Sequence, residues 1–202
     1  MALLDWMAAD AALVIEGEDV RLRPPRMADF VAWSALRDQS REFLQPWEPS
    51  WPADDLSRAA FRRRLAAYSR DIETGLGYPF FIFSPDEQTL YGGITLSNVR
   101  RGVAQTATLG YWSGRPHARK GHTFKAVKAL TNFAFTKLRL HRIEAACIPT
   151  NIGSRDLLLK AGFSLEGKAR AYLKINGAWR DHLLFGLSQD EAGWGDDTMS
   201  GG

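Results

Sequence analysis

The sequence predicts an α+β domain in which a mixed central β-sheet carries helices on both faces. The 202 residues are 45% hydrophobic, which is enough for one globular domain with a sizeable core. The runs follow in the order strand, two helices, three strands, helix, strand, helix and two strands, which argues against a doubly wound fold. Asn176 and Gly177 separate the last two strands and predict a tight hairpin turn.

The first half of the chain contains one short strand, two helices and three further strands. Apolar and polar residues alternate over 20–23 before two prolines, which predicts the short strand. Helical spacing of apolar residues predicts helices over 26–39 and 54–73, with a proline-punctuated aromatic loop over 44–52 between them. The three strand-like runs that follow are 78–84, 90–99 and 103–114.

The second half is predicted to fold as helix, strand, helix and hairpin. A long amphipathic helix is expected over 118–138, and a strand over 141–149 ends at a proline. Asn151 as N-cap and Gly162 just past the last turn delimit a short helix. The hairpin then occupies 163–187.

The two ends of the chain differ in composition from its middle. We expect 1–17 to form an N-terminal tail or helix, 18–188 the domain, and the Gly- and Asp-rich 189–202 a flexible tail. The apolar start is interrupted by Asp5 and Asp10 and has no cationic segment, which argues against a signal peptide. No apolar run reaches membrane-spanning length, so we expect a cytoplasmic protein.

Charge and cysteine content limit the classes of function. The net charge of +3 is compatible with anionic ligands and does not demand nucleic acid. The single cysteine, Cys147, excludes an internal disulfide framework and a multi-cysteine metal site. Cys147 alternates with Ile143 and Ala145 on a strand, as a small buried hydrophobe does. We therefore expect no metal, no membrane and no direct nucleic-acid partner.

The stretch ARKGHTFKAV, residues 118–127, is a candidate phosphate-binding loop. A helix N-terminus presents unpaired N–H groups and about half a positive charge, which can cradle a pyrophosphate. Gly121 would let a phosphate approach the backbone, and Arg119 and Lys120 add positive charge. An ordinary helix start with solvated cations explains the same residues, so this stretch alone leaves both interpretations open.

Longer motifs resemble the GCN5-related N-acetyltransferase (GNAT) superfamily. They are GYWSGRPHARKGHTFKAVKALTNFAF and the run from LHRIEAACIPTNIGSRDLLLKAGF to LKINGAWRDHLLFGL. FLQPWEP, SNVRRG and INGAWRDH resemble, more narrowly, the ribosomal-protein-alanine N-acetyltransferase branch of the RimJ type. The resemblance covers roughly Val20 to Leu187 and implies a GNAT fold with a splayed strand pair for acyl-CoA.

The resemblance implies acetyl-CoA as the acetyl donor. Its pyrophosphate would rest on the backbone amides of Arg119, Lys120, Gly121, His122 and Thr123. Its pantetheine arm would pair, like an added strand, with Leu109, Gly110, Tyr111 and Trp112. Asn151 would face that arm, and Ser154 would lie near the sulfur.

The candidate loop departs from the family pattern at its start. The pattern's usual first residue is Gln or Arg, often followed by a glycine two positions before Gly121; Ala118 and Arg119 stand there in this chain. His122 and Thr123 also replace smaller or apolar residues. An amide cradle uses the backbone, so donor binding can survive these changes, while a bulkier Arg119 leaves a reduced or lost affinity as the other outcome.

Acetyl transfer to an amine needs three things from the protein or the solvent. The amine must be neutral, the carbonyl oxygen must be stabilised, and the leaving thiolate must be protonated. A protein α-amino group has a pKa of about 7.7–8.0, so a weak base or a water chain suffices. A backbone N–H near Leu109 or Gly110 is the best oxyanion donor.

The candidate acids and bases each have a structural explanation beside the catalytic one. Following the resemblance, Ser154 is the candidate acid, but it also suits a first-turn hydroxyl; Tyr172 is the alternative acid, or a sheet-face tyrosine. Glu48 in the PWEP loop is the candidate base or amine anchor, or a surface carboxylate. Asp181 and His182 could serve, although strand residues there more often pin the hairpin.

Three functions remain open from the sequence. The resemblance favours an acetyl-CoA-dependent N-acetyltransferase that acts, by direct transfer, on the α-amino group of a ribosomal protein starting with alanine or serine. The same fold could acetylate a small amine such as an antibiotic, a polyamine or an amino acid. A non-catalytic CoA- or ribosome-binding module is the third possibility. Its candidate RNA-contacting face, which a solvated surface explains equally, would consist of Arg62, Arg63, Arg64, Arg100 and Arg101. Under each of the three functions we expect a monomer or a homodimer.

Overall fold

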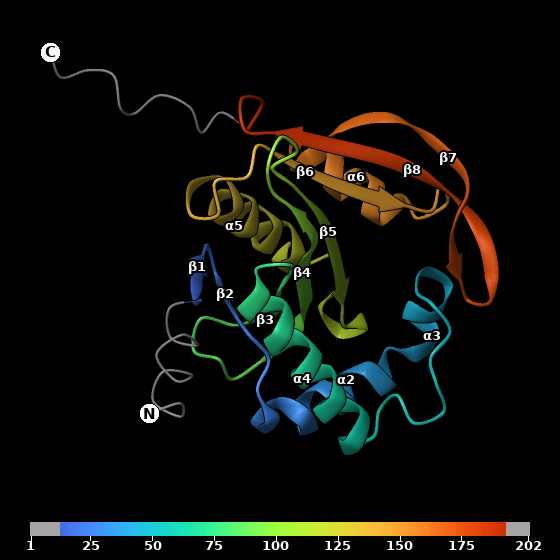
Figure 1. Cartoon of the computed structure of the whole chain (residues 1–202). Coiled ribbons are helices and arrows are strands. Elements are labelled where there is room, and N and C mark those ends of the chain that lie inside the picture. The colour runs from blue at the N-terminus through green and yellow to red at the C-terminus, as the bar shows by residue number, and fades with distance from the viewer. Residues whose placement is uncertain (1–12, 193–202) are drawn as a thin grey trace, which may run out of the picture.

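The computed structural model describes residues 13–192 and is built on one mixed sheet of eight strands (Figure 1). The strand order is β1-β2-β3-β4-β5-β6-β8-β7, and the β5–β6 pair is parallel whereas the other neighbours are antiparallel. The strands are β1 (Ile15–Gly17), β2 (Val20–Arg23), β3 (Tyr78–Phe83), β4 (Leu90–Arg100), β5 (Thr106–Ser113), β6 (Arg142–Cys147), β7 (Ser164–Ile175) and β8 (Ala178–Ser188).

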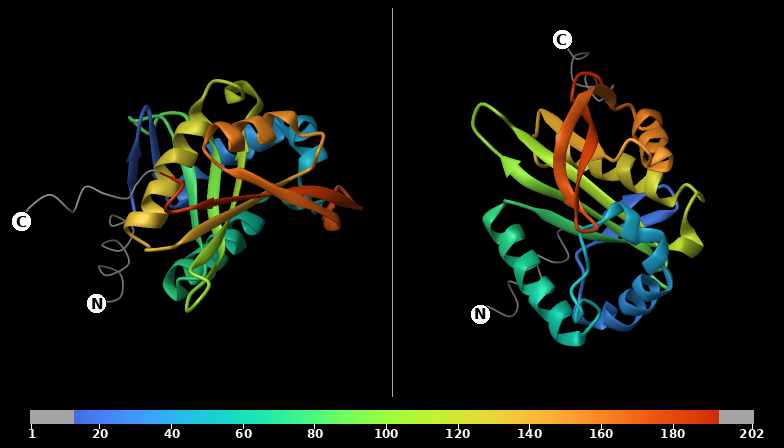
Figure 2. Two further views of the ribbon diagram at one scale, coloured as in Figure 1. Left: turned by 90° about the horizontal axis from the view of Figure 1, so that it is seen from above. Right: turned by 90° about the vertical axis from the view of Figure 1, so that its right-hand side faces the viewer.

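Helices pack on both faces of this sheet, as the sequence predicts (Figure 2). The α-helices are α2 (Phe30–Gln39), α3 (Arg41–Leu44), α4 (Arg58–Thr74), α5 (His122–Thr136) and α6 (Ile152–Lys160). Short 3-10 turns are η1 (Met27–Asp29), η2 (Gln45–Trp47) and η3 (Arg115–His117).

Alternate side chains of strand β3 belong to two different hydrophobic clusters, one on each face of the sheet. Phe80 and Ile82 belong to the large cluster that includes the buried face of α5, whereas Phe81 and Phe83 belong to a smaller cluster with α2 and α4. Successive side chains of a strand point to opposite faces, so this alternation places α5 on one face of the sheet and the α2–α4 pair on the other.

The parallel pair β5–β6 is hydrogen-bonded over only part of its length. Pairing runs from Thr106 opposite Arg142 to Leu109 opposite Ala145. Strand β5 continues to Ser113, bonded to β4 alone, while β6 ends at Cys147. The two strands therefore part after Leu109, and one side of β5 is left for another partner.

The predicted elements are present, with three corrections. A strand at Ile15–Gly17 precedes the predicted first strand and lies within the segment expected to be a tail or a helix. The helix expected from residue 118 starts at His122, because Gly121 adopts a left-handed conformation with φ 87°. The helix expected from 54 starts at Arg58, where the Ser57 hydroxyl accepts from the Ala60 N–H. Residues 1–12 and 193–202, which include most of both predicted tails, lie outside the described residues.

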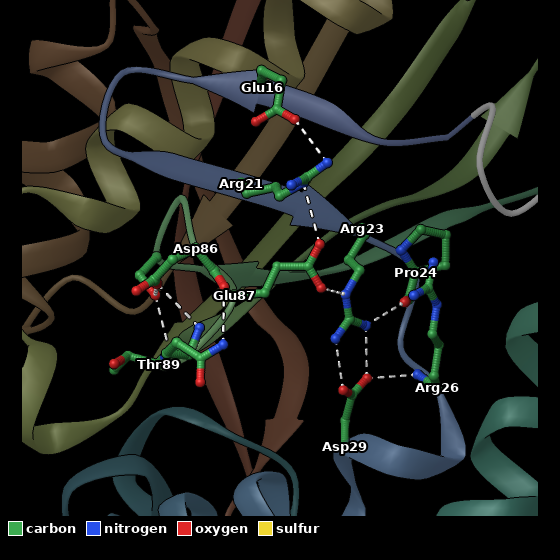
Figure 3. Close-up of polar contacts among 11 residues, drawn as sticks. Glu16, Arg21, Arg23, Pro24, Arg26, Asp29, Asp86, Glu87 and Thr89 are labelled. Carbon is green, nitrogen blue, oxygen red and sulfur yellow. Dashed lines mark hydrogen bonds and ion pairs between the residues drawn. The ribbon is translucent and has the colours of Figure 1, made fainter.

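A buried ion-pair network joins the first strands to the helical layer (Figure 3). The Arg23 guanidinium donates to both Asp29 oxygens, at 2.9 and 2.7 Å, and to Glu87 at 2.6 Å. Arg23 and Asp29 are 5% and 7% exposed. Such a buried pair is costly to break, because removing one partner leaves the other charge uncompensated.

Asp29→Ala should lower the free energy of unfolding by about 3 kcal/mol, because it leaves Arg23 buried with Glu87 as its remaining carboxylate. Asp54→Ala is the control, since its bridge to Arg63 is exposed to solvent and should contribute little to stability. Urea denaturation of both variants measures the difference. Equal losses would contradict a stabilising role for the buried network.

Candidate active site

The opening between β5 and β6 is flanked by the first turn of α6. Asn151 caps this helix as predicted: its side-chain Oδ1 accepts from the Ser154 N–H at 3.1 Å. The cap orients the turn that carries Ser154. On β5, Gly110 has open space where a side chain would stand, with no heavy atom within 4 Å of a Cβ built there. A ligand can therefore approach the β5 backbone at the point where pairing with β6 has ended.

Three polar side chains meet at this opening: Tyr111, Cys147 and Ser154. The Tyr111 hydroxyl lies 2.8 Å from Ser154 Oγ. Burial raises the pKa of the Tyr111 phenol, with the hydrogen bond to Ser154 acting in the opposite direction, so the phenol is neutral and able to donate near pH 7. Burial also raises the pKa of the Cys147 thiol, which therefore stays protonated.

Tyr111 is the site residue whose connection the sequence analysis missed. It was predicted as a pantetheine neighbour on β5, without a link to Ser154. The two residues are 43 positions apart, so helical or strand periodicity does not connect them. The separation of β5 from β6 is what brings a hydroxyl from β5 against the first turn of α6.

The loop before α5 contains two residues in the left-handed conformation, Arg119 and Gly121. Gly121 is the N-cap of α5, and no heavy atom lies near the position of an added Cβ. Its positive φ, and not a lack of space, is therefore the reason that glycine is favoured at this position. Arg119 also has a positive φ, of 60°. That is the position at which the family pattern often has glycine. The chain therefore keeps the left-handed conformation there with an arginine, at a cost in strain.

The other predicted loop residues lie at the start of α5. Lys120 precedes the N-cap, and His122 and Thr123 form the first turn. The His122 ring stacks on Tyr91, with 3.8 Å between ring centroids. Partial burial, followed by nearby lysine charges, lowers the pKa of His122. An anion bound at this turn would counter those charges.

A cavity of about 400 Å³ lies beside the smaller core, between the early loop and β3, β4 and β5. Gly110, Tyr111 and Trp112 line it, so it meets the same stretch of β5 as the opening next to β6. Much of the remaining wall is aromatic, with Trp33, Trp51, Tyr68 and Phe81. Strand β5 therefore borders both the opening next to β6 and this cavity.

Glu48, the predicted base or amine anchor, lies in the wall of this cavity. Its two carboxylate oxygens accept from the Arg37 guanidinium, each at 2.7 Å, and Oε2 also accepts from Trp51 Nε1 at 2.8 Å. Its backbone oxygen accepts from the Asn176 N–H, at the tip of the β7–β8 hairpin. The residue therefore organises the early loop, and a role toward an amine stays a prediction.

The other predicted acids and bases lie on the long β7–β8 hairpin. Tyr172 is 47% exposed, and its ring meets His182 edge to face. Asp181 forms an ion pair with Lys168 and accepts from the Ala171 N–H, so it pins the hairpin as expected. The structure brings Ser154 to Tyr111 rather than to Tyr172.

The candidate RNA-contacting face is largely engaged in internal contacts. Arg63 and Arg64 pair with Asp54 and Asp55. Arg100 pairs with Glu144, and Arg101 donates to the Leu138 carbonyl. Of the described helices, none is long and apolar enough to cross a membrane.

The fold and the site define a class: a GNAT-type acetyltransferase, with its parted parallel strands, its cradle before a helix and its opposed cavity. A family-wide sequence profile for the "Acetyltransferase (GNAT) domain" matches residues 19–164, and the chain belongs to this family. It is an N-acetyltransferase by class.

The chain is also similar in sequence and in structure to individual N-acetyltransferases. The chain is 36% identical over 163 residues to the [Ribosomal protein uS5]-alanine N-acetyltransferase of Escherichia coli (strain K12), covering 81% of each chain. It is 34% identical over 174 residues to the probable N-acetyltransferase YjcK of Bacillus subtilis (strain 168), covering 86% of this chain and 96% of that one. Mycobacterium smegmatis RimJ, solved in complex with CoA-disulfide, superimposes with a TM-score of 0.82 at 33% identity, covering 88% and 87%.

Gly121→Ala should weaken acetyl-CoA binding, because alanine disfavours the positive φ that orients the first amides of α5. Gly102→Ala is a matched control: that glycine has φ 66°, open space around its Cβ position, and lies in the β4–β5 turn. Both variants should lose about 1–2 kcal/mol of stability. Calorimetry with acetyl-CoA should show weaker binding for the Gly121 variant alone; equal affinities would contradict the cradle.

Proposed function

We propose that this N-acetyltransferase moves the acetyl group of acetyl-CoA directly to the α-amino group of a protein N-terminus. The acceptor class is a ribosomal protein with alanine or serine at its start, and the reaction is cytoplasmic. The observation that carries the proposal is the end of β5–β6 pairing at Leu109, with Ser154 and Tyr111 at the opening and the cavity across β5. The similarity to a uS5-alanine N-acetyltransferase supports the choice of acceptor.

The residues of the donor side fit acetyl-CoA. Arg119 to Thr123 supply left-handed turns, helix N–H groups and two cations for a pyrophosphate. Over 110–113, β5 is paired with β4 on one side and has no partner strand on its β6-facing side, where it can bond an extended amide-containing arm as an edge strand bonds an added strand. Acetyl-CoA would supply an activated thioester. The Gly114 N–H donates to Tyr91 of β4, so by strand alternation the Gly110 N–H also faces β4. Of the two predicted donors to the oxyanion, the N–H of Leu109 is therefore the candidate.

The Ser154–Tyr111 pair would handle the proton of the leaving group. As the new C–N bond forms and the C–S bond breaks, Ser154 Oγ gives its proton to the thiolate. Tyr111, held neutral by burial, orients the Ser154 hydroxyl through the 2.8 Å contact, and solvent returns a proton to Ser154 Oγ after the thiol has left. The proton lost by the amine leaves through solvent or through a weak base on the cavity side. The Glu48 carboxylate is the candidate for that base, or for an amine anchor.

An activity panel tests the proposed function. Purified protein would be incubated with acetyl-CoA and peptides starting with alanine, serine or a blocked residue, and in parallel with a polyamine, an amino acid and an aminoglycoside. We expect thiol release and an added acetyl group on alanine- and serine-starting peptides alone. Acetylation restricted to a small amine would overturn the choice of acceptor, and acetyl-CoA binding without turnover on any amine would indicate a binding module.

Ser154→Ala should lower kcat by about 10–100-fold with little change in the KM for acetyl-CoA, because it removes the proton donor. Tyr111→Phe should lower kcat in the same direction, since Ser154 then lacks its phenol partner. Tyr172→Phe serves as the control and should keep the wild-type rate. Steady-state kinetics with a saturating peptide measure all three. A slow Tyr172 variant beside a fast Ser154 variant would move the acid to the hairpin.

A further inference from the structure

The acceptor cavity contains polar groups that its own walls do not satisfy. Among residues 13–192, four buried side-chain polar atoms have no hydrogen-bond partner. Three of them belong to residues that line this cavity: Asp55 Oδ2, Arg37 Nε and Arg64 Nε. A buried donor or acceptor without a partner is costly, so such groups mark a place where a ligand can supply the missing bond.

Asp55 is the acceptor in this set. It lies on the loop just before α4 and is 9% exposed. One carboxylate oxygen, Oδ1, accepts from Arg64 at 2.8 Å, which fixes the side chain; the other, Oδ2, is unpartnered. The second carboxylate in the wall differs, because both oxygens of Glu48 already accept from Arg37. Asp55 is thus the carboxylate of this wall that has an oxygen without any partner.

The groups without a partner include one hydrogen-bond acceptor and two donors, and this combination indicates the kind of ligand. An amine or polyamine offers N–H groups alone and would leave the two guanidinium N–H groups unpaired. A peptide main chain offers an N–H and a carbonyl oxygen in each residue. It can donate to the Asp55 carboxylate and accept from a guanidinium, while the aromatic walls contact its apolar parts.

We infer that Asp55, held by Arg64, positions the acceptor by accepting a main-chain N–H that lies behind the reacting amine. The inference rests on the proposed peptide acceptor and adds a residue to it. The reacting amine must stay free to attack, so the bonded group is the N–H of the second or third residue of the peptide. Asp55 is a positioning residue here, because it contacts the acceptor away from the atoms that react.

Atom replacement on both sides of this contact tests the inference. The substrates are an alanine-starting peptide and two analogues in which an ester oxygen replaces the N–H of the second or of the third residue. The enzymes are wild type, Asp55→Asn, and the matched control Asp54→Asn, whose carboxylate pairs with Arg63 outside the cavity. Asp55→Ser is a second variant that also removes the carboxylate. Urea denaturation establishes that each variant folds.

With wild type and Asp54→Asn, one of the two esters should have a KM about tenfold above that of the amide peptide. This increase corresponds to the loss of one charge-assisted hydrogen bond. With Asp55→Asn or Asp55→Ser, the amide peptide should itself have a KM raised about tenfold, and that ester should carry no further penalty. The KM for acetyl-CoA should not change in any variant, a split that a merely structural role of Asp55 would not produce.

Two results would overturn the inference, and they differ. In the first, wild type acetylates the peptide while the ratio of ester KM to amide KM is the same in wild type and in the Asp55 variants for both esters. In that case the positioning role is wrong and the proposed function stands. If wild type acetylates a small amine and no peptide, both the positioning role and the proposed acceptor are wrong.

Discussion

The end of hydrogen bonding between β5 and β6 is the constraint on which the rest of the site depends. A parallel pair normally satisfies both strands along their length, yet here the ladder stops at Leu109 and Ala145. Backbone groups beyond that point need another partner, and an extended ligand can supply one. The same separation admits the first turn of α6, so that Ser154 reaches the Tyr111 hydroxyl from across the opening. One break in pairing thus creates both a strand edge without a partner and a contact between two hydroxyls.

The acceptor side depends on long-range contacts of another kind. Its wall is held by two arginine–carboxylate pairs, Arg37 with Glu48 and Arg64 with Asp55, that link loops to helices α2 and α4. Arg37 also lies over the Trp51 ring, at 4.1 Å. These charged groups shape the cavity, and they differ in one respect: both oxygens of Glu48 have hydrogen-bond partners, whereas Asp55 keeps one oxygen without a partner.

Local chemistry explains what the sequence could predict. Asn151 as a cap, the turn at Asn176 and Gly177, and the two faces of most helices follow from neighbours in the chain. These local patterns and the family resemblance together predicted the fold class, which the structure confirms. The pairing of Ser154 with Tyr111 and the unpartnered oxygen of Asp55 depend on contacts between distant segments, which periodicity does not report. The left-handed Arg119 was visible only as a departure from a pattern; its backbone angle needed the structure.

The hydrogen bond from the Asn176 N–H to the Glu48 carbonyl has an evolutionary consequence. It joins the hairpin tip to the early loop, whose residues Glu48, Pro49 and Ser50 line the cavity. Because both bonded groups belong to the main chain, most substitutions at 48 or 176 can leave this link in place; proline at 176, which has no N–H, cannot.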